Sequence, residues 1–317
     1  MIFSAEYLNA LAVKTGFQTA SLQKQMWLII ILREIHRHPL LSKAYVLRGG
    51  TAINLFWYAL PRLSVDIDLN YISSPDREVM RQERVKLEKQ LSRLLESLQV
   101  SVERIPDEHA GGKWRLRTKS AFGGNFALEI DLNYVMRVPV WGVNTRTAQS
   151  PDVDYTTDFP TVSLEELFAG KIKALMERSA ARDLYDVYRL GAQMSRVNPT
   201  KVRKAVILFG VTCDQDWRKK DYGTINAIDE TMISRELTPL LRSGDAPDLE
   251  EMKREVKGLL DVLMNYSKTE RQFLDQFLDM GEYNPQLLFN DSAQARALSA
   301  HPVVLWKLQN HRDYLGL

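Results

Sequence analysis

Two short segments carry the residue types that phosphate and metal chemistry need. The first is an apolar stretch from Val46 that ends in Gly49-Gly50 and continues into Thr51. A strand that ends in a Gly-Gly turn and opens a helix directs backbone N–H groups and the positive helix end toward one point. The pattern therefore predicts a turn that binds phosphate.

The second segment places two carboxylates one residue apart. Asp66 and Asp68 alternate with apolar residues, which is the period of a strand with both carboxylates on one face. Proteins commonly bind Mg²⁺ through one or two carboxylates, with water and substrate phosphates as the other ligands. Metal-assisted transfer often uses two ions about 3.5–4 Å apart. A third carboxylate is therefore expected.

The third carboxylate is predicted in the alternating segment 126–134, where Glu129, Asp131 and Asn133 share one side of a strand. Periodicity does not choose between Glu129 and Asp131, because both face the same way. A Gly-Gly pair alone indicates only a loop, and an Asp-x-Asp pair alone is commonly a solvated face. The order of the three segments favours a joint site over these simpler interpretations.

This order of Gly-Gly, Asp-x-Asp and a later acidic strand resembles the DNA polymerase β-like nucleotidyltransferase superfamily, although the spacing from Gly50 to Asp66 is longer than its commonest pattern. A closer resemblance is to the AbiEii toxin family, which includes the MenT-like toxins. It is carried by the segments Leu47–Ala52, Arg62–Leu69 and Arg182–Asp186, and by Lys171. The similarity extends from about residue 40 to about residue 190.

The resemblance implies a Mg²⁺-dependent nucleotidyltransferase that uses a nucleoside triphosphate. The metal ligands it implies are Asp66, Asp68 and either Glu129 or Asp131. Asp131 is favoured as ligand or base by the family pattern. The implied nucleotide-binding residues are Arg48, Gly49, Gly50, Thr51 and Lys171. The remaining implied site residues are Asp183 or Asp186, to orient the site, and Ser64, for catalysis and its regulation.

The resemblance also implies a biological role, as the toxin of a bacterial toxin–antitoxin or phage-defence pair. Its partner would be an antitoxin protein or transcriptional regulator, and its acceptor a tRNA 3′ end. Nucleotidylation of a protein or small molecule is an alternative, and a nucleotide-binding module without turnover is another. Apart from the resemblance, a set of charged helix residues fits surface ion pairs worth only ~0–1 kcal/mol each: Lys171, Arg178, Arg182, Asp183 and Asp186.

Two cationic features bear on a nucleic-acid partner. Four cations alternate along one predicted strand, at Lys113, Arg115, Arg117 and Lys119. Such a row can neutralise the phosphates of a polynucleotide or of the triphosphate. It can equally protect an exposed edge strand from aggregation. Residues 171–220 contain 12 Lys and Arg against 5 Asp and Glu. This excess favours a polyanionic partner or a solvated face.

The 317 residues are 45% hydrophobic with a net charge of +2, which is typical of a globular protein of one or two domains. We predict an α+β fold with a nucleotidyltransferase domain over 1–160, a mixed sheet flanked by helices, and an all-helical domain over 161–317. In the first part, helices are predicted over 5–14, 19–38 and 75–98, and strands over 100–105, 113–119 and 125–134. Residues 141–160 fit an irregular connection or a short strand.

The single cysteine, Cys213, excludes an internal disulfide framework and a Cys-rich zinc site. The longest apolar run, 26–32, is far shorter than the ~20 residues that cross a bilayer. The N-terminal residues show no basic segment followed by an apolar one. Together these features favour a cytoplasmic protein without a membrane partner.

Overall fold

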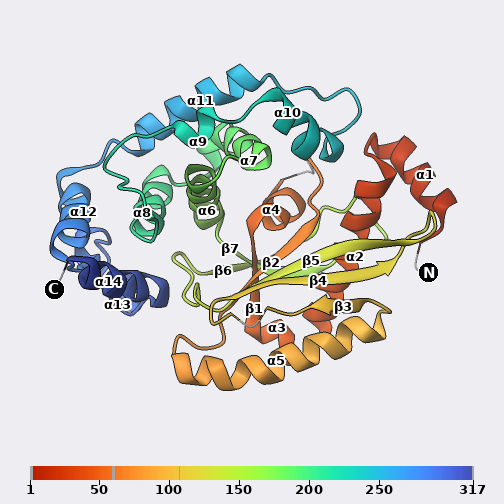
Figure 1. Ribbon diagram of the computed structural model, residues 1–317, viewed down its shortest axis with the longest axis horizontal. Coiled ribbons are helices and arrows are strands. Elements are labelled where there is room, and N and C mark those ends of the chain that lie inside the picture. Colours follow the sequence, from red (N-terminus) through yellow and green to blue (C-terminus); the bar gives the residue numbers. More distant parts are fainter. Residues whose placement is uncertain (1–2, 59–60, 107, 316–317) are drawn as a thin grey trace. The chain divides into compact units, whose positions relative to one another are not determined.

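The first part of the chain is built around a seven-stranded mixed sheet (Figure 1). The computed structural model describes residues 3–58, 61–106 and 108–315. The sheet order is β3-β4-β5-β2-β1-β7-β6. Its strands are β1 (Tyr45–Arg48), β2 (Asp66–Tyr71), β3 (Ser101–Arg104), β4 (Gly111–Lys119), β5 (Asn125–Asn133), β6 (Val143–Thr147) and β7 (Asp158–Val162).

Strand pairing places the two acidic strands side by side. Strand β2 runs antiparallel to β1 and parallel to β5, and β4 runs antiparallel to β5. The predicted strands over 100–105, 113–119 and 125–134 are confirmed as β3, β4 and β5, and the segment 141–160 contains β6 and the start of β7. Strand β4 lies between β3 and β5, so the edge-strand interpretation of its cation row is wrong.

One face of the sheet is apolar and covered by helices. Ile67, Ile130 and Trp114 are buried on the centre strands, while the charged residues between them are at least partly exposed. The Tyr71 hydroxyl donates to Glu83 of α5 at 2.7 Å, which fixes α5 under this face. The helices of this unit are α1 (Ala5–Thr15), α2 (Thr19–Arg37), α3 (Leu41–Ala44), α4 (Gly49–Thr51), the π-helix η1 (Ala52–Trp57) and α5 (Arg77–Ser97).

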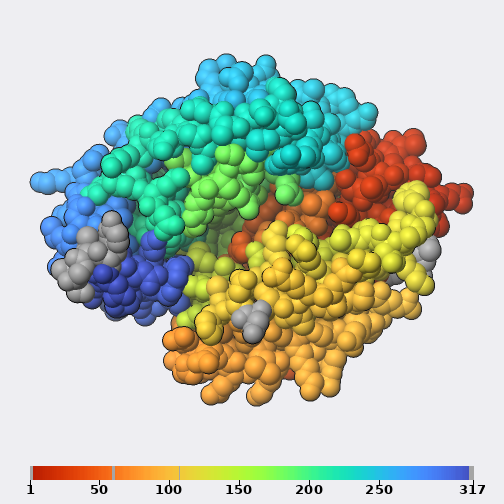
Figure 2. All heavy atoms as spheres, viewed as in Figure 1, coloured from red at the N-terminus to blue at the C-terminus, as the bar shows by residue number. Residues whose placement is uncertain are grey.

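The helix predictions for this unit are confirmed as α1, α2 and α5. Helix α5 is amphipathic, because Met80, Leu87, Leu91 and Leu95 point inward and are buried. Most of its charged side chains are exposed, and the helix forms the orange surface at the bottom of Figure 2. The segment Thr238–Asp245, which includes the 3₁₀ turn η4 (Thr238–Leu240), belongs to this unit and not to its sequence neighbours.

The second unit comprises Leu164–Leu237 and Ala246–Leu317, and among its described residues the regular elements are all helices. Its elements are α6 (Leu164–Glu177), α7 (Ala181–Gly191), η2 (Met194–Arg196), α8 (Pro199–Gly210), α9 (Gly223–Asn226), α10 (Glu230–Met232), η3 (Ile233–Leu237), α11 (Leu249–Leu263), α12 (Lys268–Met280), η5 (Pro285–Leu287), α13 (Ser292–Ser299) and α14 (Pro302–Leu315). The predicted α+β class, with a mixed sheet followed by a helical part, is confirmed. Among the described residues, no helix combines the length and the hydropathy needed to cross a bilayer.

Candidate active site

The predicted carboxylates lie in register on two neighbouring parallel strands. Asp68 of β2 pairs with Asp131 of β5, and Asp66 pairs with Glu129. Since side chains alternate along a strand, all four point from the same face of the sheet. This face is opposite to the one that α5 covers, so the carboxylates are only partly buried.

Arg48, the last residue of β1, bridges two of these carboxylates. Its Nη2 lies 3.0 Å from Asp131 Oδ2, and its Nη1 lies 3.8 Å from Asp68 Oδ1. Its Nε is buried and has no hydrogen-bond partner among the described residues. One guanidinium therefore supplies the positive charge that holds two neighbouring carboxylates together.

Gly49 brings the backbone against Asp68 more closely than a side chain would allow. Its φ is +71°, in the left-handed region, and a Cβ built on it would lie 2.8 Å from Asp68 Cγ and overlap the carboxylate. Glycine meets both conditions because it has no Cβ. Gly49 is thus required because any larger residue would displace Asp68, a predicted metal ligand.

The other residues of the two motifs lie around Asp66. The Thr51 side chain is fully buried and donates its hydroxyl to the Asp66 carbonyl, so it ties the glycine turn to β2. The Ser64 hydroxyl lies 3.5 Å from Asp66 Oδ1. The Gly50 carbonyl accepts from Asn54 Nδ2 at 3.0 Å. These contacts give Thr51 and Gly50 a structural role, and their predicted contact with phosphate stays a prediction.

Geometry distinguishes Asp131 from Glu129, which periodicity could not. The Glu129 carboxylate lies 3.0 Å from Lys113 Nζ and is 37% exposed. Asp131 shares Arg48 with Asp68 instead. Burial lowers the pKa of Lys113, but Glu129, Asp66 and Asp131 outweigh this effect and raise it. Lys113 is therefore held as a cation beside the acidic face.

The second predicted cluster lies wholly within the helical unit. Lys171 on α6 places its Nζ 2.8 Å from Asp183 Oδ1 and 2.8 Å from Asp186 Oδ2, both on α7. Both aspartates are 1% exposed and Lys171 is 8% exposed. The interpretation of these residues as surface ion pairs is wrong, because the pair of helices buries all three.

Arg178 is a second cation on Asp183, with Nε 2.8 Å from Oδ2. Burial alone would raise the pKa of the Asp183 carboxyl. Lys171 and Arg178 outweigh that effect by attraction and hydrogen bonding, so the pKa is lowered below its ordinary value. Asp183 is therefore a carboxylate near neutral pH, and it holds Lys171 in place.

A comparison of the sequence with known families decides the family. Residues 30–277 match the profile of the nucleotidyl transferase AbiEii toxin, a type IV toxin–antitoxin system. The chain belongs to the AbiEii family. It is a nucleotidyltransferase toxin by that membership, which implies a nucleoside triphosphate substrate and an antitoxin. No curated protein sequence matches the chain.

Two solved structures are similar to this AbiEii protein. It is similar to MenT4, a nucleotidyltransferase toxin of Mycobacterium tuberculosis H37Rv, with 15% identity and a TM-score of 0.64 over 98% of this chain and 99% of that one. A structure from H. pylori, provisionally described as a nucleotidyltransferase, gives 17% identity and a TM-score of 0.48 over 78% of this chain and 96% of that one. At these identities, the MenT4 likeness shows the fold alone.

The acidic face offers oxygen donors of the kind that a divalent metal binds. Carboxylate oxygens are the donors that Mg²⁺ prefers, and Asp66, Asp68 and Asp131 supply them from adjacent register positions. Among the described residues, no group of three or more Asp, Glu, His or Cys side chains is already gathered around one point. The donor chemistry fits the metal, and the Arg48 guanidinium occupies the position of a cation between Asp68 and Asp131.

The sequence analysis did not identify Gln25 as part of the site. Gln25 of α2 is fully buried and accepts the Ser64 backbone N–H at 2.9 Å, so it fixes the residue beside Asp66. A glutamine within an otherwise apolar run is the sequence signal for this residue. The predicted ion pairing of Arg178 with the helix aspartates is present, because Arg178 contacts Asp183 from the end of α6.

Proposed function

We propose that this AbiEii protein transfers a nucleoside monophosphate from a nucleoside triphosphate to the 3′ end of a tRNA, with Mg²⁺ as cofactor. In this role it acts in the cytoplasm as the toxin of a phage-defence pair. The observation that carries the proposal is the pairing of Asp68 with Asp131 on two parallel strands, beside Gly49. The backbone of Gly49 is left-handed and lies too close to Asp68 for any residue with a Cβ.

The proposed reaction joins the acceptor 3′-oxygen to the α-phosphorus, and pyrophosphate leaves. Bound Mg²⁺ would neutralise the phosphate oxygens and lower the pKa of the attacking hydroxyl. Asp66, Asp68 and Asp131 would hold the metal, and Asp131, which lies opposite Asp68 in the strand register, is the proposed ligand or acceptor of the hydroxyl proton. Glu129, paired with Lys113, is assigned to electrostatic support instead.

The glycine turn is assigned to the triphosphate. Arg48 ends β1 one residue before the turn, and a guanidinium binds phosphate oxygens through two parallel hydrogen bonds. We propose that Arg48 leaves the carboxylates for the nucleotide phosphates once a divalent cation replaces its charge. Ser64, whose hydroxyl lies near Asp66, orients that carboxylate.

Lys171, Asp183 and Asp186 are assigned to the reaction on the family resemblance. Their burial supports a fixed charge arrangement: two aspartates hold one ammonium group in place. A lysine preorganised in this way stabilises negative charge without a cost of reorientation. Lys171 is the proposed ligand of the triphosphate, and Asp183 and Asp186 are positioning residues.

The test uses the purified full chain with Mg²⁺, total tRNA and each of the four α-³²P-labelled nucleoside triphosphates. We expect label in tRNA from one or more nucleotides, and at least a 10²-fold loss in the Asp68→Asn and Asp131→Asn variants, since each removes one carboxylate charge with little change of shape. The Glu129→Gln variant is the matched control on the same strand and is expected to retain activity within about tenfold.

Other outcomes identify other functions. Label in protein, or in a small molecule, would move the acceptor to the alternative class while keeping the transfer chemistry. Triphosphate binding without transfer to any acceptor would favour a binding module. Equal activity of Asp68→Asn and the unaltered chain would contradict the assigned metal ligands.

A further inference from the structure

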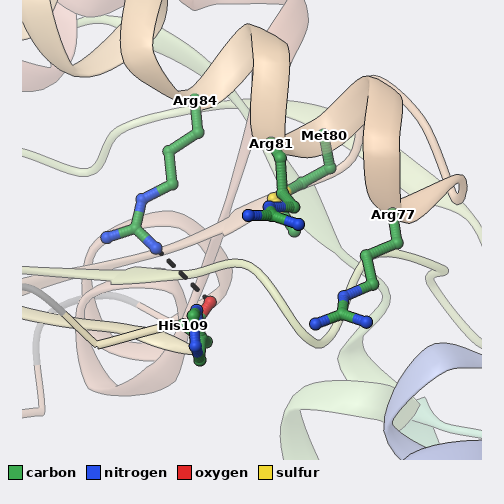
Figure 3. Close-up of a pocket in the computed structure, with 5 residues that line it drawn as sticks. All are labelled: Arg77, Met80, Arg81, Arg84 and His109. Carbon is green, nitrogen blue, oxygen red and sulfur yellow. Dashed lines mark hydrogen bonds between the residues drawn. The ribbon is translucent and has the colours of Figure 1, made fainter.

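A second charged feature lies in the first unit, on the helix that covers the opposite face of the sheet from the carboxylates. Figure 3 shows a pocket lined by Arg77, Met80, Arg81 and Arg84 of α5 and by His109 of the loop before β4. The arginines recur at intervals of four and three residues, so they share one face of the helix. The proposed transfer reaction uses none of these five residues.

Arg84 forms the rigid wall of the pocket. Its Nε lies 2.7 Å from Glu88 Oε1, and its Nη1 donates to the Glu108 carbonyl at 2.8 Å and to the His109 carbonyl at 3.3 Å. Its guanidinium also stacks on the Tyr134 ring, 4.7 Å from the centroid. Arg84 therefore holds the loop against α5 and keeps the pocket open.

Arg77 and Arg81 are the accessible cations. Both are exposed, and the contacts of the described residues include no ion pair of Arg77. Arg81 lies 3.5 Å from Glu78, and both of these side chains are more than half exposed. An exposed pair of this kind contributes only ~0–1 kcal/mol, so an incoming anion can replace the carboxylate.

The guanidinium groups of the pocket favour a phosphate. Arg77 and Arg81 present them to solvent. The other acidic groups on the first turns of this 21-residue helix are engaged elsewhere, because Asp76 caps the helix, Glu83 accepts from the Tyr71 hydroxyl and Glu88 pairs with Arg84. Guanidinium groups match phosphate oxygens through paired hydrogen bonds. The exposed His109 ring can stack on an unpaired base.

The chain connects this pocket to the acidic face over a short distance. His109 precedes Lys113 by four residues, and Lys113 pairs in register with Asp131. Four residues of extended chain span at most about 14 Å. A nucleic acid held at His109 would thus pass around the end of β4 to reach Asp131 on the other face of the sheet, a path of a few nucleotides.

We propose that the pocket of Arg77, Arg81 and His109 binds the phosphodiester backbone of the acceptor RNA a few nucleotides from its reacting end. The inference rests on the proposed function for the identity of the RNA, but the binding itself requires neither nucleotide nor metal. Contacts of this type position a nucleic acid without reading its sequence. Affinity is therefore expected to depend strongly on salt.

The test measures the binding of fluorescein-labelled tRNA to the full chain by anisotropy, between about 50 and 200 mM salt. All proteins carry Asp66→Asn, so that turnover does not alter the RNA. The pocket variant is Arg77→Gln/Arg81→Gln. The matched control is Lys89→Gln/Arg93→Gln, which removes the same charge from exposed positions of the same helix outside the pocket.

We expect the pocket variant to bind about tenfold more weakly, with a slope of log affinity against log salt that is smaller by about 1–2. The control variant should change affinity less than about threefold, because its charges act only at long range. Unfolding midpoints of both variants should match the parent, since the replaced side chains are exposed.

Equal RNA binding by the two variants would overturn the proposal. The proposal would also be overturned if the pocket variant kept its affinity for RNA but lost affinity for a labelled poly-aspartate peptide, because the pocket would then recognise acidic protein. Failure of label transfer to tRNA, with the expected loss of RNA binding, would contradict the proposed function and leave this inference in place.

Discussion

The substitution Gly49→Ala is the sharpest test of the glycine turn. Two effects follow from the structure. Alanine at φ +71° is strained by roughly 1–2 kcal/mol, because its Cβ approaches the backbone carbonyl oxygen in the left-handed region. The new Cβ also lies 2.8 Å from Asp68 Cγ, well inside van der Waals contact. The carboxylate of Asp68 must therefore move.

The two effects can be separated with a second glycine. Gly124, in the turn between β4 and β5, has φ +70°, and a Cβ built on it meets nothing within 4 Å. Gly124→Ala therefore carries the same backbone strain without displacing a carboxylate. The difference between the two variants isolates the displacement of Asp68.

The expected size of that displacement effect is large for catalysis. Misplacing a reacting group by about 1 Å commonly costs on the order of 10²-fold in rate, which is about 2.7 kcal/mol of barrier. We expect Gly49→Ala to transfer label at least about 10²-fold more slowly than the unaltered chain. Gly124→Ala should remain within about twofold. Backbone strain should lower the free energy of unfolding in urea by roughly 1–2 kcal/mol in Gly124→Ala, and the added contact with Asp68 should make the loss larger in Gly49→Ala.

Both variants are assayed for label transfer with α-³²P-labelled nucleoside triphosphate and tRNA, and for urea unfolding by circular dichroism. Equal rates for the two variants would refute the reasoning, because the contact with Asp68 would then have no catalytic consequence. A rate loss in both that follows their loss of folded protein would refute it as well. Rates are therefore compared per folded molecule.

Three further predictions concern charged and buried groups. Arg48→Gln removes the cation between Asp68 and Asp131, so we expect its free energy of unfolding without metal to be about 1 kcal/mol lower than that of the unaltered chain. Adding Mn²⁺ should raise the melting temperature of this variant more than that of the unaltered chain. Equal rises would contradict the bridging role of Arg48. Neighbouring cations lower the pKa of Asp183 below 3.8, so its stabilisation is complete above that pH and is lost as the pH falls through the lower folded-state pKa. The difference in unfolding free energy between the unaltered chain and Asp183→Asn, about 3 kcal/mol near neutral pH, should therefore shrink in urea titrations below pH ~3.8; a constant difference would speak against the ion pair. Burial raises the pKa of Cys213 to about 12, so a disulfide reagent should react with its thiol at pH 8 only after urea unfolding, and fast labelling of the folded chain would show that the thiol is accessible.

Local sequence patterns were sufficient for much of the fold. Helices α1, α2 and α5 follow from amphipathic spacing and from Pro39 after α2, and the strands follow from alternation at Asp66–Leu69 and around Asp131. These signals are local, because the period of a helix or strand is set by backbone geometry. The division of the chain at residue 160 stays a prediction, and the return of residues 238–245 to the first unit has no local signal.

The sequence by itself determined the family, the α+β class and the residue types of the candidate site. Tertiary structure decided which of those residues meet. The parallel pairing of β2 with β5 places Asp131 opposite Asp68 and within reach of Arg48, whereas Glu129 pairs with Lys113. Burial between α6 and α7 makes Lys171 a fixed ammonium group and not a surface residue. Such contacts join residues far apart in the chain, and their register is set by packing of the whole sheet and helix pair, which no single window of sequence contains.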